Sequence, residues 1–257
     1  ESLGVESSVA TPNAPQPWNL AFNSGDDRAY RVAVDPSDGS VYVVGYGENL
    51  VGATGKDWWI KKFAADGAED TSLWNKMVDG ASGDDVASAI AVSPADGSIY
   101  VVGYGTNLLG NGDLDWWLKK YASDGTEDTT NWDKRIDSGL GSDNAVSIAL
   151  DATGSAVYVV GYVADNAIDW RIRKYSAAGV EDTANWNISV GSLYASNPSY
   201  DYPSDIAVSA GGNVYVVGYT RDPAAGNAEW TIKKYSSTGV EDTANWNKIF
   251  ANGNAWS

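Results

Sequence analysis

The sequence predicts an all-β protein built from four repeated units, each a small antiparallel sheet. One segment, VYVVGY at residues 41–46, recurs with one conservative change at residues 99–104, 157–162 and 214–219. The copies start 58, 58 and 57 residues apart, and a fixed period of this length is typical of solenoids, propellers or arrays. Alternating aromatic and β-branched residues favour strands, and turn residues before the copies favour hairpins.

The composition allows one large all-β domain or two ordinary ones, and it excludes several kinds of chemistry. The 257 residues are 43% hydrophobic, which is enough for a core, and include neither histidine nor cysteine. A Ser-His-Asp triad, a cysteine nucleophile and a histidine-ligated zinc site are therefore excluded. The net charge of −17 argues against binding nucleic acid or anionic lipid. No apolar run approaches the length of a membrane span.

We expect residues 1–17 to form an extended N-terminal tail. This segment is rich in Ser, Ala, Pro and Asn and has no hydrophobic periodicity. Next, Trp18, Leu20 and Phe22 alternate and so face one side of a strand. Copies of this tryptophan segment lie at residues 74–78, 132–136, 186–190 and 246–250. We expect each copy to form the outer strand of a unit. The mixture of Trp with Asn and Lys suits a half-solvated edge, and the repeated tryptophans themselves should belong to the core.

Three more strands complete each unit. A strand of small residues, the inner strand, is expected near residues 29–34, 88–92, 146–150 and 205–208. A tight turn then leads into the VYVVGY strand, and a third strand follows at residues 57–63, 115–121, 169–175 and 229–235. Gly45, Gly103, Gly161 and Gly218 are expected where a neighbouring side chain leaves no room for a Cβ. The Glu-Asp-Thr segment after each third strand predicts a short helical turn.

Four short strands in each of four units, with turns throughout, are typical of the blades of a β-propeller. The run Gly/Ser-x-Val-Tyr-Val-x-Gly-Tyr resembles the bacterial β-propeller repeat called SBBP and, more distantly, the NHL repeat. The resemblance covers residues 18–250 and implies a secreted or surface protein. The predicted fold is a four-bladed propeller, residues 18–257, with an extra N-terminal strand. Its repeats cover about 18–73, 74–131, 132–185 and 186–250.

Carboxylates are the remaining candidates for catalysis, and their pattern favours structural roles. Asp26 with Asp27 and Asp84 with Asp85 are adjacent pairs. Neighbouring residues of an extended chain point to opposite faces, so neither pair is a ready acid–base pair, although both could gather a cation at the channel mouth. Other acids recur in every unit and therefore serve the blade. We expect no enzyme activity, no metal site and no cofactor.

The loops that differ between units are the better indication of binding. The loop before the fourth inner strand is longer than its equivalents and carries Tyr194, Tyr200 and Tyr202. Tyrosine-rich loops on a rigid scaffold suit recognition. A carbohydrate-binding, lectin-like propeller that recognises a cell-surface glycan is therefore one hypothesis for the function.

The count of outer strands favours a different function. Four units need four outer strands, but the sequence has five copies, so one terminal copy is surplus. A surplus strand rich in Trp, Leu and Phe is an adhesive edge that can join a neighbour's sheet. The candidate assembly residues are Trp18, Leu20, Phe22, Trp246, Ile249, Phe250 and Trp256.

Our leading hypothesis is an extracellular structural protein that self-assembles into a filament or closed oligomer through terminal strand exchange. Its first residue, Glu1 rather than Met, favours a mature secreted product. A further alternative is that the chain is half of a larger propeller completed by dimerisation.

Strand exchange predicts the effect of truncation. A variant that starts at Asn23 should fold, because its four units remain complete, but should no longer polymerise, because the adhesive strand is gone. Light scattering of the native particle measures this. If that variant and a variant ending at Asn245 both form the same large particles as the full chain, strand exchange is wrong.

Overall fold

The computed structural model describes residues 25–52, 55–80, 82–137, 141–164, 167–191, 200–221 and 228–250, which contain sixteen strands and no helix. The strands form four antiparallel sheets, and in each sheet the spatial order follows the chain. The predicted all-β fold with four blades of four strands is therefore confirmed.

The four blades have similar bounds. Blade 1 consists of β1 (Arg28–Val34), β2 (Val41–Glu48), β3 (Lys56–Phe63) and β4 (Lys76–Val78). Blade 2 consists of β5 (Val86–Val92), β6 (Ile99–Thr106), β7 (Leu114–Tyr121) and β8 (Lys134–Ile136). Blade 3 consists of β9 (Asn144–Leu150), β10 (Ala156–Ala164), β11 (Ile168–Ser176) and β12 (Ile188–Val190). Blade 4 consists of β13 (Tyr202–Val208), β14 (Val214–Arg221), β15 (Ala228–Tyr235) and β16 (Lys248–Phe250).

A glycine near the end of each second strand faces an irregularity in the inner strand. The pairing register shifts here in all four blades. A Cβ at Gly45, Gly103, Gly161 or Gly218 would lie 1.8 to 2.3 Å from an inner-strand carbonyl oxygen. The predicted side-chain obstacle exists at Gly161 and Gly218, where Trp116 and Trp170 lie 2.6 Å away. At all four positions, however, the closest obstacle is backbone.

Each outer strand begins two residues after its tryptophan. The expected helical turn precedes that tryptophan: Trp74 N donates to Asp70 O, and the Asp70 carboxylate accepts the amides of Ser72 and Leu73. The expectation that the repeated tryptophans belong to the core is confirmed in three blades, because Trp74, Trp132 and Trp186 are fully buried. The turn directs these side chains between blades, and the residues that follow form the sheet edge.

The structure identifies which tryptophan segment completes a blade. β16 pairs with β15, with Trp230 opposite Phe250, so residues 246–250 belong to the sheet of blade 4. The surplus copy is therefore Trp18 to Phe22, which lies outside the described residues, as do the tail and Trp256. Each sheet begins with its inner strand. Each repeat defined from the sequence begins one strand earlier, with the tryptophan segment.

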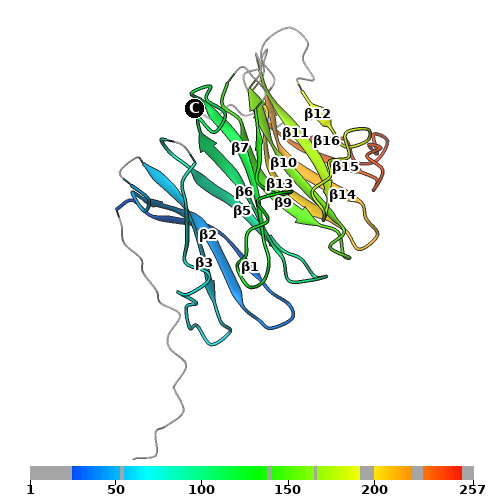
Figure 1. Cartoon of the computed structure of the whole chain (residues 1–257). Helices are drawn as coiled ribbons and strands as arrows, with labels where there is room; N and C mark the ends of the chain where they lie inside the picture. Colours follow the sequence, from blue (N-terminus) through cyan, green and yellow to red (C-terminus); the bar gives the residue numbers. More distant parts are fainter. Residues whose placement is uncertain are drawn as a thin grey trace, which may run out of the picture.

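The four blades follow one another in an open series. Separate hydrophobic clusters join blade 1 to blade 2, blade 2 to blade 3, and blade 3 to blade 4. The inner strands pack in the same order, β1 on β5, β5 on β9 and β9 on β13. No packing of similar extent joins β13 to β1 in the described part of the chain. Figure 1 shows the sheet of β1–β3 and the sheet of β13–β16 at opposite ends of the series.

The described residues also include no helix that is long and apolar enough to span a membrane.

Candidate interaction surfaces

Each blade presents two different apolar faces to its neighbours. We call the side that packs on the following blade the forward face, and the side that packs on the preceding blade the backward face. The forward faces of the first three blades carry these buried residues: Tyr42, Val44, Trp58, Ile60 and Trp74; Tyr100, Val102, Trp116, Leu118 and Trp132; Tyr158, Val160, Trp170, Ile172 and Trp186. The equivalent residues of blade 4 are Tyr215, Val217, Trp230, Ile232 and Trp246.

One tryptophan of each forward face lies at the start of the third strand and reaches across the junction. The ring of Trp58 packs on Trp117 with centroids 4.9 Å apart. Trp58 Nε1 donates a hydrogen bond of 2.9 Å to Tyr104 O of blade 2, and Trp116 Nε1 donates an equivalent bond to Tyr162 O of blade 3. These two contacts satisfy a polar group that burial would otherwise leave without a partner. At the third junction, Trp170 Nε1 is buried and has no hydrogen-bond partner in the described part of the chain.

The other tryptophan precedes the outer strand and makes the same contacts at all three junctions. Trp74 Nε1 donates to Ser123 O at 3.1 Å, and its ring lies 5.9 Å from that of Tyr121. The corresponding pairs are Trp132 with Ala177 O and Tyr175, and Trp186 with Ser237 O and Tyr235. A tyrosine of the same blade holds each indole edge to face: Tyr42, Tyr100 and Tyr158 at 4.8 to 4.9 Å.

The forward face of blade 4 is built in the same way but is not covered to the same extent. Tyr215 holds Trp246 edge to face at 5.1 Å. Trp230 is 73% exposed, whereas Trp58, Trp116 and Trp170 are 0% exposed. Phe250 is also exposed, although its equivalent in blade 3, Val190, is buried.

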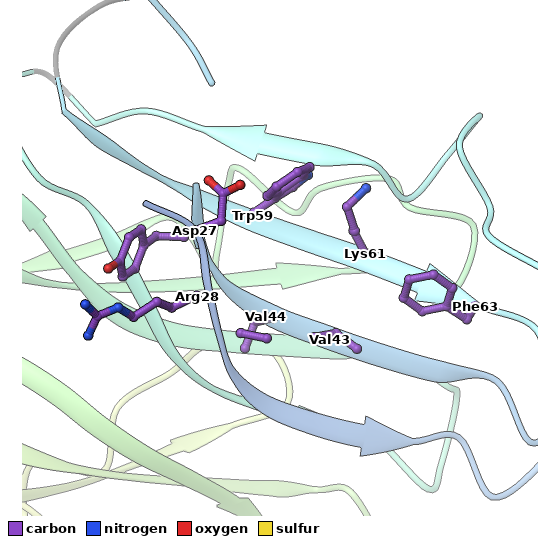
Figure 2. A pocket seen from close by; sticks show the side chains of 10 residues that line it. Asp27, Arg28, Val43, Val44, Trp59, Lys61 and Phe63 are labelled. Atoms are coloured by element: carbon purple, nitrogen blue, oxygen red, sulfur yellow. The ribbon is translucent and has the colours of Figure 1, made fainter. Parts of the chain in front are cut away.

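The backward face of blade 1 borders a hollow of about 330 Å³. Figure 2 shows Trp59, Lys61 and Phe63 of β3 and Val43 of β2 around this hollow. On β1, Val32 is 62% exposed, whereas its equivalents in the later blades, Ile90, Ile148 and Ile206, are buried. The series of blades therefore has an exposed apolar surface at each end.

The repeated carboxylates hold loops together by accepting backbone hydrogen bonds. The aspartate before each inner strand accepts the amide at or near the end of the second strand: Asp27 from Glu48, Asp85 from Thr106, Asp143 from Ala164 and Asp201 from Arg221. Asp57 and Asp115 accept amides of the loop that precedes them, from Val51 and Leu109. These bonds support the interpretation that acids present in every blade serve the blade.

Two groups of three aspartates are close enough to hold a cation. Asp57, Asp79 and Asp85 form one group, and Asp113, Asp115 and Asp137 form the other, each with one oxygen per residue within 4.8 Å of the others. Oδ1 of Asp57 and Oδ1 of Asp79 are buried and accept no hydrogen bond within the described part of the chain. The absence of a bound metal stays a prediction.

Asp84 and Asp85 are neighbours in sequence with opposite electrostatic environments. Burial, together with the nearby Asp79 and Asp57 carboxylates, raises the pKa of Asp85 to about 7. The hydrogen bond from Lys56, whose Nζ lies 2.8 Å from Oδ2 of Asp84, lowers the pKa of Asp84. The two carboxylates also have different hydrogen-bond partners: Asp84 accepts from Lys56, and Asp85 accepts the amides of Gly80 and Thr106.

Two of the three predicted binding tyrosines lie in one cluster. Tyr200, Tyr202, Tyr219 and Arg221 line a shallow hollow beside the start of β15. Tyr202 packs against Tyr162 and Tyr219, with ring centroids 5.0 and 5.5 Å away, and Tyr200 is 49% exposed. Tyr194 lies outside the described residues.

The described assembly residues do not all lie on one surface. Trp246 and Phe250 lie on the uncovered forward face of blade 4. Ile249 is exposed to the same degree as its equivalent Met77 in blade 1, so it does not belong to a face that another blade covers. Sequence reasoning missed Trp230. Its position in the repeat could have identified it, because Trp230 is the fourth copy of a tryptophan that a following blade covers in the other three units.

No family model matches the chain, and no curated protein matches it in sequence. Among solved structures, it is similar to an endo-1,5-α-L-arabinanase from Thermotoga petrophila, with 12% identity, TM-score 0.43, and coverage of 87% of this chain and 59% of the other. A family 43 glycoside hydrolase from Bacillus licheniformis has 12% identity, TM-score 0.40, and coverage of 79% and 55%. The periplasmic gluconolactonase of Pseudomonas aeruginosa has 11% identity, TM-score 0.37, and coverage of 92% and 87%.

The chain spans little more than half the length of the two glycan-cleaving enzymes. At these identities and TM-scores the neighbours carry no argument about activity or substrate. The four blades are defined by the four sheets of this chain.

Asp85 predicts a specific dependence of stability on pH. Its pKa is about 7 in the folded protein against 3.8 for the unperturbed group, so between about pH 4 and pH 7 the folded state keeps a proton that the unfolded state releases. The free energy of unfolding should therefore fall as pH rises through this window, by at most about 4 kcal/mol at about 1.4 kcal/mol per pKa unit. In Asp85→Asn this decline should be smaller, as measured by urea unfolding at pH 4.5 and pH 8.

Asp84→Asn is the matched control, because the lowered pKa of Asp84 has the opposite sign. That variant should lose stability at neutral pH relative to the wild type and lose less at low pH. An equal decline from pH 4.5 to pH 8 in the wild type and in Asp85→Asn would contradict the assignment.

Proposed function

We propose that this chain is a non-enzymatic structural protein that assembles with copies of itself, with the exposed forward face of blade 4 as a contact surface. The observation that carries the proposal is the exposure of Trp230, 73% against 0% for its three equivalents. Isolated exposed apolar residues are ordinary on protein surfaces. Here, however, the exposed residue belongs to a complete face whose other copies are buried by a neighbouring blade.

Covering this face contributes favourable free energy to association. A buried tryptophan removes about 150–250 Å² from water. Covering the exposed part of Trp230 is then worth roughly 3–5 kcal/mol as an upper limit, at about 25 cal/mol per Å². Trp246 and Phe250 add to this, and association opposes it with the loss of translational and rotational freedom.

The use of the repeated acids supports a structural role. One aspartate of each blade occupies an equivalent position and accepts an equivalent backbone amide of its own blade: Asp27, Asp85, Asp143 and Asp201. A catalytic constellation would be expected once in the chain, in a hollow with groups of distinct roles. The extracellular or cell-surface location is part of the proposal and rests on the resemblance to the SBBP repeat.

Replacing Trp230 tests the proposal. Trp230→Ser should weaken self-association by about 100-fold, because roughly 3 kcal/mol corresponds to about two powers of ten. The measurement is the mass of the native particle across a dilution series, by light scattering. Val180→Ser is the control, because Val180 is similarly exposed, at 68%, but lies in a turn away from both end faces. A wild-type chain that is monomeric at every concentration would contradict the proposal.

Carbohydrate binding is the second candidate function, favoured by the cluster around Tyr200. Its half-exposed ring, the neighbouring Tyr202 and Tyr219, and Arg221 line one hollow, and aromatic rings beside polar groups suit the faces and hydroxyls of sugars.

Strand exchange through Trp18, Leu20 and Phe22 stays a prediction, because these residues lie outside the described part.

Tyr200→Ala should lower the binding of any glycan found on an array by about tenfold or more, which corresponds to about 1.4 kcal/mol. Tyr30→Ala is the control, since Tyr30 has similar exposure, 42%, but lies on β1 of blade 1. A wild-type protein that binds no glycan above background would remove this candidate.

A further inference from the structure

We infer that Asp57, Asp79 and Asp85 form a binding site for a calcium ion. The three carboxylates come from different elements: Asp57 lies near the start of β3, Asp79 directly follows β4, and Asp85 directly precedes β5. An ion held by all three therefore ties the end of blade 1 to the beginning of blade 2. The inference goes beyond the proposed self-assembly and does not depend on it.

The first support is the distance between the carboxylates. Each of the three residues offers one oxygen, and these oxygens lie within 4.8 Å of one another. Ca²⁺ binds its oxygen ligands at about 2.3–2.6 Å, so two oxygens up to about 5 Å apart can share one ion. A chain without histidine and cysteine offers a metal mainly oxygen ligands, which are the ligands that Ca²⁺ prefers.

The second support is a buried carboxylate oxygen that no donor satisfies. Asp57 is 0% exposed, and its Oδ2 accepts the amide of Val51. Its Oδ1 is buried and accepts no hydrogen bond from any described residue, and the same holds for Oδ1 of Asp79. Such oxygens cost free energy unless a partner is bound. Because Ca²⁺ can bind one or both oxygens of a carboxylate, a cation at this group supplies the partner.

The third support is the balance of charge around the group. Among the ion pairs of the described residues, none involves Asp57, Asp79 or Asp85. Lys56 is the neighbour of Asp57 in sequence, but its Nζ lies 2.8 Å from Oδ2 of Asp84. Carboxylates that share one place repel each other when ionised, so a divalent cation supplies the positive charge that no basic side chain brings.

The position of Asp79 differs between blades. Its equivalents are Asp137 in blade 2 and Gly191 in blade 3, and the outer strand of blade 3 pairs in the same register without an acid after it. A blade therefore does not require Asp79. The expectation of no metal site rested on acids that recur in every blade, and Asp79 is not one of them. In blade 2, Asp137 again lies in a group with two other aspartates.

Carboxylates that bind a metal are deprotonated. The pH dependence predicted above for Asp85 therefore applies to the protein in EDTA, and the urea unfolding that tests it is carried out in EDTA.

Calcium binding to the full chain tests the inference. Thermal unfolding is followed in EDTA and in about 1 mM CaCl₂, and isothermal titration counts the bound Ca²⁺ ions. The unfolding temperature of the wild type should rise by about 5 °C in calcium, because the ion binds the folded state. Asp79→Asn should bind one ion fewer than the wild type and show a smaller rise. Asp57→Asn is a second variant with the same expected result.

A matched control is needed because a chain with a net charge of −17 attracts divalent cations to its whole surface. Asp66→Asn removes the same charge from an exposed turn beyond the other end of β3, and it should bind as many ions as the wild type. An equal loss of the calcium response in Asp66→Asn and Asp79→Asn indicates general charge screening and overturns the inference.

Two further results would overturn the calcium site. One is a wild-type protein that binds no Ca²⁺, and the other is an unchanged number of bound ions in Asp79→Asn. Asp79 is only half-buried, so its variant decides the question even if Asp57→Asn does not fold. The mass of the particle is not part of this test. Failure of the calcium site therefore leaves self-assembly standing, and a monomeric particle leaves the calcium site standing.

Discussion

The burial of both faces of each blade is the constraint on which the rest of this structure depends. A single repeat cannot bury its own hydrophobic faces, so each blade depends on a neighbour to cover them. Two tryptophans, Trp58 and Trp74 in blade 1, are among the largest fully buried side chains and donate their indole N–H groups to backbone carbonyls of the following blade. The turn before each outer strand and the glycine opposite each inner-strand irregularity serve to bring these faces together.

The strands could be predicted from the sequence because their signals are local. Alternation of side chains and turn residues lie within a few positions of each other, and the expected inner strands agree with β1, β5, β9 and β13 to within about two or three residues. The burial of Trp74 could also be predicted, because its tryptophan recurs in every unit, although the polar neighbours Asn75 and Lys76 indicate an edge. Whether the four blades close, in contrast, is not a local property. The angle between two sheets depends on which side chains meet, such as Trp58 against Trp117, and no single segment contains both.

The candidate sites show the same division. Tyr200 and Tyr202 could be predicted to lie together because one loop contains them, but Tyr219 and Arg221 join them only through the pairing of β13 with β14. Similarly, Asp84 and Asp85 are neighbouring residues of the same type, so the sequence does not distinguish them. In the structure Asp84 pairs with Lys56, whereas Asp85 is buried beside Asp79. Trp230 is the clearest case, since its residue type and position are those of a core residue, and its exposure follows from the lack of a fifth blade in the described part.

The difference between the forward and backward faces gives the molecule a direction. Two forward faces brought together would place tryptophans against tryptophans, without the carbonyl acceptors that their indole N–H groups have at internal junctions. Any string of copies would thus have two chemically distinct tips, much as a cytoskeletal polymer does. A small protein that displays a single face of one kind would stop growth at one tip and leave the opposite tip able to extend.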